Sequence, residues 1–125
     1  MSAGLTDTDV LPQRWQQHRM HIRCGLSPHQ SWRIASYLQL GQQLIERGHA
    51  SAVNVQLRML HTLLSSAGDA LLPTPWRHVC LLEAQAPLVW LRAELGLHDP
   101  LALQAVECAH QRVQRRLQHG PQNKD

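Results

Sequence analysis

Four side chains that can bind a metal ion or haem iron lie close together near the N-terminus. They are His18, His21, Cys24 and His29, and the first three follow one another at intervals of three positions. In a helix this spacing keeps the side chains on one side of the helix surface. Imidazole and thiolate groups suit zinc, copper or haem iron as ligands. The stretch therefore raises the hypothesis of a metal or haem site.

The rest of the sequence gives this hypothesis limited support. A structural zinc site takes four ligands, commonly in close pairs such as Cys-x-x-Cys, whereas this stretch offers one thiol and no carboxylate. The Cys-x-x-Cys-His motif that attaches c-type haem is absent from the sequence. Cys80 could complete a ligand set from elsewhere in the chain, so the metal candidates are His21, Cys24 and Cys80. The competing interpretation is a solvated face of histidines with cysteines that serve as small packing residues.

Patterns typical of catalysis or of nucleic-acid binding are missing. The sequence has no Gly-rich phosphate loop, no G-x-S-x-G motif and no paired carboxylates. Arg112, Arg115 and Arg116 form the densest basic cluster, but they precede a helix end, where cations are favourable in any protein. We therefore expect a protein that is not an enzyme, needs no cofactor and does not bind nucleic acid.

The composition predicts one globular domain in a reducing compartment. The chain has 125 residues, 43% of them hydrophobic, and a formal net charge of +3, which fits a single domain. Three widely spaced cysteines do not make a disulfide framework. The N-terminal stretch lacks the basic and apolar regions of a signal peptide, and apolar runs fall short of the ~18 residues of a membrane span. These features predict a cytoplasmic protein without a membrane segment.

Hydrophobic residues recur at helical spacing along the chain, and no segment alternates as a strand would. The predicted fold is a single compact all-α domain of five to six short helices, arranged as a helical bundle or as helical hairpins. Residues 1–11 are expected to be a flexible lead, 12–120 the domain, and 121–125 a flexible tail. Helices are predicted from Pro12 to Cys24, from a Ser27 cap to Gly48, from Ser51 to Ala67, from about Pro75 to Gly96 with an interruption at Pro87, and from Pro100 to Gly120.

The segment from Tyr37 to Leu60 resembles one tetratricopeptide unit, with Gly41 at the position where a small residue lets two helices approach closely. No second copy follows in register, so an ordinary helical hairpin remains the alternative. If two helices cross closely at Gly41, a larger side chain there should destabilise the protein; the alternative is a Gly41 that faces solvent.

Trp32 and Arg33 form the candidate interaction surface. Trp32 lies two positions from Ile34, so it should point away from the apolar stripe of its helix. An exposed tryptophan beside an arginine is typical of a protein-binding surface. The alternative is a tryptophan at the edge of the core.

Three segments together resemble the FagA proteins, which are small bacterial polypeptides associated with the iron-uptake repressor. The resemblance covers about residues 14–90, and its most specific part is "LPTPWRHVCLLEAQAPL". The matching positions are Trp15, Ile22, Arg23, Cys24, Tyr37, Leu38, Gly41, Leu44, Leu72, Pro73, Trp76, Arg77, Cys80, Leu81, Ala84, Pro87 and Leu88.

The resemblance implies an iron-repressed gene but no enzymatic activity. Cys24 and Cys80 fall inside the matching motifs, whereas the histidines at 18, 21, 29 and 78 fall at open positions. The leading hypothesis is a small cytoplasmic accessory protein of the iron-limitation response that contacts another protein or a second copy of itself. The alternative is a metal- or haem-handling protein that uses Cys24, Cys80 and nearby histidines.

Overall fold

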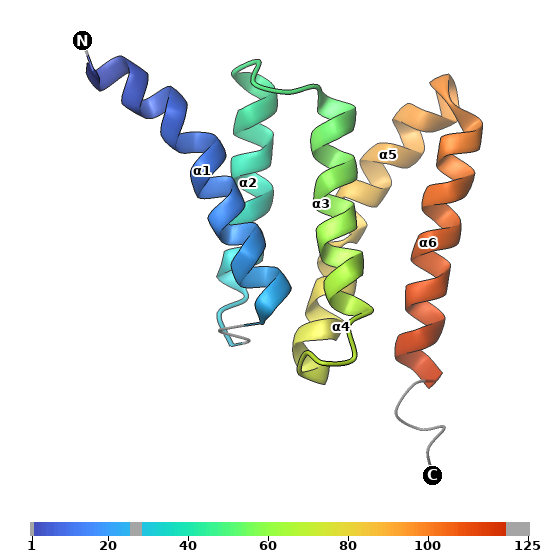
Figure 1. Cartoon of the computed structure of the whole chain (residues 1–125). Coiled ribbons are helices and arrows are strands. Elements are labelled where there is room, and N and C mark those ends of the chain that lie inside the picture. The colour runs from blue at the N-terminus through green and yellow to red at the C-terminus, as the bar shows by residue number, and fades with distance from the viewer. Residues whose placement is uncertain (1, 26–28, 120–125) are drawn as a thin grey trace.

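The computed structural model describes residues 2–25 and 29–119, and within these ranges the chain forms six helices and no strand (Figure 1). This confirms the predicted all-α fold of five to six helices packed as a bundle. The helices are α1 (Ser2–Cys24), α2 (Trp32–Glu46), α3 (Ala52–Ala67), α4 (Thr74–Glu83), α5 (Gln85–His98) and α6 (Pro100–His119).

The central element is α3, which packs against each of the other five helices. In Figure 1, α1 and α2 lie on one side of α3, while α6 lies on the opposite side. A helix surrounded in this way must be apolar on more than one face. Accordingly, Val55, Met59 and Leu63 are buried together with Leu60 and Leu64, so α3 contributes two adjacent apolar faces to the core.

Two predicted helix starts differ from the observed ones. The helix expected to open at Pro12 begins at Ser2, and Pro12 lies inside it. Proline favours the first turn of a helix, but inside a helix it removes one hydrogen bond without preventing the turns before it. The helix expected after the Ser27 cap begins at Trp32, and Ser27 with Pro28 lies outside the described residues.

The predicted end of α2 is confirmed. Gly48 has φ of +76°, a left-handed conformation that glycine adopts at little cost. The amide of His49 donates to the carbonyl of Leu44 at 2.9 Å, and the amide of Gly48 donates to the carbonyl of Ile45 at 3.1 Å. These two bonds make the Schellman arrangement that satisfies the last carbonyls of a helix.

The predicted interruption near Pro87 is also confirmed. The chain leaves α4 at Ala84, and Pro87 occupies the first turn of α5, where a missing amide hydrogen costs nothing. The next junction follows the predicted Asp99-Pro100 start, since the Asp99 carboxylate accepts from the Ala102 amide at 3.2 Å. The last residue of α5 is His98 rather than the predicted Gly96.

Gly41 lies where α1, α2 and α3 meet. A Cβ atom there would come within 2.5 Å of Met59 Sδ and 3.2 Å of Trp15 Nε1 and Val55 Cγ1, so these three neighbours would have to move. Trp15 donates from Nε1 to the Tyr37 carbonyl at 3.1 Å and stacks on the Tyr37 ring with centroids 5.3 Å apart. The close helix crossing predicted at Gly41 is therefore present.

Candidate functional site

The three metal candidates occupy different environments. Cys24 is exposed at the end of α1, Cys80 is buried in α4, and His21 is half-buried. Within residues 2–25 and 29–119, no three His, Cys, Asp or Glu side chains gather in a group that could hold a metal ion. The structure therefore does not bring the sequence candidates into a common ligand set.

Cys80 has the properties of a packing residue. It is 0% exposed, and burial raises the pKa of its thiol to about 12, an effect that the neighbouring Glu83 reinforces and Arg23 opposes. The thiolate is the form that binds metal ions and attacks electrophiles. A thiol that stays protonated at neutral pH is a poor candidate for either role.

The interpretation of Cys24 as a packing residue is wrong. Its side chain is exposed, while Ile22 in the same turn is fully buried. Residues two positions apart in a helix are separated by about 200° around its axis. The burial of Ile22 therefore turns Cys24 toward solvent. The sequence pattern placed both residues near the end of an apolar face and did not separate them.

His18 and His21 are not on a fully solvated face. Both are half-buried, and the Nδ1 atom of each is buried without a hydrogen-bond partner among the described residues. Burial lowers the pKa of His18, and the positive charges of Arg33, His21 and Arg14 lower it further. His18 is therefore held in its neutral form near neutral pH.

Trp32 and Arg33, at the start of α2, lie next to His18 of α1. Trp32 is 54% exposed, the Arg33 guanidinium carbon lies 4.6 Å from its ring centroid, and the His18 ring meets it edge-on at 6.2 Å. Arg33 Nε also donates to Gln30 Oε1 at 2.9 Å. We call His18, Trp32 and Arg33 the Trp32 surface. The predicted exposure of Trp32 is observed, and its ring contacts Arg33 on one face and the His18 ring at 80°.

The residues that carry the FagA resemblance mainly build the core. The fully or almost fully buried members are Trp15, Ile22, Tyr37, Gly41, Leu44, Trp76, Arg77, Cys80, Ala84, Pro87 and Leu88. Arg23, Leu38, Leu72 and Leu81 are half-buried, and Cys24 and Pro73 are exposed. The residues of the resemblance thus have mainly structural roles.

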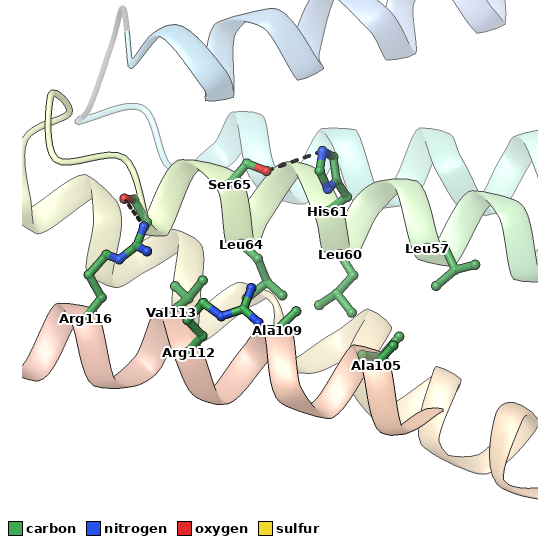
Figure 2. Close-up of a pocket in the computed structure, with 12 residues that line it drawn as sticks. Leu57, Leu60, His61, Leu64, Ser65, Ala105, Ala109, Arg112, Val113 and Arg116 are labelled. Carbon is green, nitrogen blue, oxygen red and sulfur yellow. Dashed lines mark hydrogen bonds between the residues drawn. The ribbon is translucent and has the colours of Figure 1, made fainter. Parts of the chain in front are cut away.

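A groove between α3 and α6 was not predicted from the sequence. Its volume is about 570 Å³, and leucines of α3 face small residues of α6 across it (Figure 2). The available signal was the pair Ala105 and Ala109 on the apolar side of α6, because two alanines cannot fill the space that leucines would. Arg112 and Arg116, which the sequence indicated only as cations near a helix end, also line this groove.

A scan of the chain against protein-family models found no match, and searches of curated proteins and of solved structures found none either. Across the part of the chain that the structure describes, no helix combines the length and the apolar character needed to cross a membrane.

Proposed function

We propose that this chain is a small, non-catalytic cytoplasmic protein of the FagA type that acts in the iron-limitation response by binding another protein. The observation that carries the proposal is the Trp32 surface, where an indole that is 54% exposed contacts the Arg33 guanidinium and the His18 ring. Tryptophan and arginine are the residues most enriched among the energetic centres of protein interfaces.

The geometry of this surface favours binding over mere exposure. The cation–π contact of Arg33 with Trp32 and the bond from Arg33 to Gln30 restrict the rotamers of both side chains before a partner arrives. Side chains that are ordered in advance lose less entropy on binding. A partner that covers Trp32 therefore gains apolar burial at a reduced entropic cost.

The resemblance supports the proposal at the level of the core. Most matching residues, such as Trp15, Trp76 and Cys80, are buried, so they favour a shared fold. The Trp32 surface lies outside the matching motifs. This surface supports the proposal through its geometry and not through the resemblance.

Metal or haem handling is the competing function. It would require Cys80 to ionise, and burial opposes this by raising its pKa to about 12. Metal analysis of the purified protein, together with haem titration, separates the two functions. Stoichiometric, tight binding that is lost in a Cys24→Ala/His21→Gln variant would replace protein binding as the proposed function.

Site-specific photo-crosslinking in iron-limited cells tests the protein-binding function. A benzoylphenylalanine residue is placed at position 35 in one protein, because Ala35 is exposed one turn along α2 from Trp32 and leaves the indole in place. It is placed at position 97 in another, since Leu97 is a well-exposed residue of α5. We expect one discrete crosslinked product from position 35 that is absent from position 97. Arg33→Glu, placed in the protein that carries the probe at position 35, should abolish the product.

Two outcomes would count against the proposal. One is an identical set of products from positions 35 and 97, which would indicate random collision. The other is a product at position 35 that persists with Arg33→Glu, because a partner that uses this surface should respond to the reversed charge.

A further inference from the structure

On the side of α3 that faces α6, Leu60 and Leu64 are buried, whereas Leu57 is only half-buried. Leu57, Leu60 and Leu64 point from α3 toward α6, and Ala105 and Ala109 face them from α6 (Figure 2). The short side chains of Ala105 and Ala109 leave part of the space between α3 and α6 unfilled. The result is the groove of about 570 Å³, which we call the α3–α6 groove.

The α3–α6 groove has an apolar floor and a positively charged edge. Arg112 and Arg116 of α6 line it and are exposed, and no acidic residue is among its described lining residues. Arg116 donates from Nη1 to the Gly68 carbonyl at 3.5 Å. The ion pairs among the described residues involve neither Arg112 nor Arg116. Both guanidinium groups are therefore available to an anionic partner.

We propose that the α3–α6 groove binds an acidic amphipathic helix of another protein. On the α3 side the groove extends from Leu57 to Gly68, a length of about 16 Å at 1.5 Å per residue, or three helical turns. A helix that lies in such a groove presents apolar anchors at i, i+3 or i+4, and i+7. Carboxylates beside these anchors would meet Arg112 and Arg116.

Charge and shape together select this occupant over others. A basic helix would place like charges against Arg112 and Arg116, which opposes binding. A nucleic acid would gain little from an apolar floor, because phosphate contacts dominate its binding. A single-chain amphiphile would leave part of its alkyl chain in water, since Ala105, Arg112 and Arg116 leave the groove open to solvent. The proposal does not depend on the Trp32 surface.

A display library of helical peptides tests the proposal without a known partner. The apolar stripe of each peptide varies among Leu, Ile, Met and Ala, and the flanking positions vary among Glu, Gln and Lys. The full-length protein is the bait, and the readout is the ratio of Glu to Lys at the flanking positions of selected peptides. We expect Glu to be enriched about tenfold over Lys.

Variants of the bait show whether the groove is responsible. In an Arg112→Glu/Arg116→Glu bait the preference should reverse toward Lys, while Arg115→Glu, an exposed neighbour outside the groove, should leave the Glu preference intact. Ala105→Trp should fill the groove and lower the affinity of a selected peptide about tenfold. Gln104→Trp, at an exposed position outside the groove, is its control.

Several results would overturn the inference. The first two are enrichment of Lys and no enrichment of either residue. The third is an Arg115→Glu bait that loses the Glu preference as fully as the Arg112→Glu/Arg116→Glu bait does. The groove would be an amphiphile site if dodecanoate displaced an environment-sensitive dye from the unmodified protein but not from the Ala105→Trp variant, while no peptide was selected. It would be a self-association surface if the protein formed dimers that Ala105→Trp alone dissociated.

Discussion

The indole Nε1 of Trp76 donates a hydrogen bond of 3.0 Å to the carbonyl of Ile22, which joins α4 to the last turn of α1. The next residue, Arg77, joins α4 to the last residue of α3, because its Nε donates to the Ala67 carbonyl at 2.8 Å. Both side chains are buried. The adjacent pair Trp76-Arg77 thus donates to carbonyl groups at two helix ends. The Ile22 carbonyl also accepts from the Gly25 amide at 3.3 Å.

Replacing Trp76 by Phe should lower the free energy of unfolding by about 1–3 kcal/mol. The change removes the bond to Ile22 and leaves a small cavity at a residue that is 1% exposed. Urea unfolding followed by circular dichroism measures the loss. Trp32→Phe, at an exposed position, should change stability by less than about 0.5 kcal/mol. Equal losses in the two variants would mean that the Ile22–Trp76 contact contributes nothing.

Gly41→Leu should destabilise the protein by about 1–3 kcal/mol, because the new side chain must displace Met59, Trp15 and Val55. Thermal unfolding measures the effect. Gly96→Ala is the matched control, since a Cβ there would make only an ordinary 3.7 Å contact with Leu103, and in a helix it should stabilise by about 0.4–1 kcal/mol. A Gly41→Leu protein with an unchanged melting temperature would contradict the close crossing.

The three cysteines should separate into two classes of reactivity. Cys24 and Cys108 are exposed and should react quickly with a thiol reagent in the native protein, whereas Cys80 is buried with a raised pKa and should react only after denaturation. Absorbance titration with a disulfide reagent gives the number of fast thiols. In Cys24→Ala one fast thiol should disappear. Rapid modification of Cys80 in the native state would refute its assigned environment.

Protein stability should decrease as the pH falls below about 6.5, and His110 should be one cause. Burial lowers the pKa of His110 from its ordinary 6.5, with Arg92 adding to this and Glu107 opposing it. Its Nε2 also lies 3.3 Å from Gln85 Nε2, which can only donate, so the imidazole must accept as a neutral group.

The sign follows from proton linkage. The unfolded state binds a proton on His110 at a higher pH than the folded state does. The stability that neutral His110 contributes is therefore complete above pH 6.5 and is lost as the pH falls through its lowered pKa in the folded state. Urea unfolding at several pH values should show a shallower dependence for His110→Gln, with a remaining slope from His18, whose pKa is also lowered. An unchanged slope in His110→Gln would show that His110 titrates alike in both states.

Local chemistry in the sequence determined the helices and several of their ends. Helical periodicity predicted the all-α fold, Gly48 predicted the end of α2, and Pro87 predicted the break between α4 and α5. These features depend on interactions within a few residues, such as missing amides and permitted values of φ. Pro12 is compatible with the first turn of a helix and also with its interior, and there the predicted boundary was wrong.

Only the tertiary structure decided which apolar residues are covered. Helical spacing indicates one apolar stripe on α3, through Val53, Leu57, Leu60 and Leu64. The structure buries a second face beside it and leaves Leu57 of the first stripe only half-buried. It also buried Cys80 and exposed Cys24, although both lie in similar motifs. Burial depends on which helices pack against a face and how far their side chains reach, and helical spacing within one segment does not contain that information.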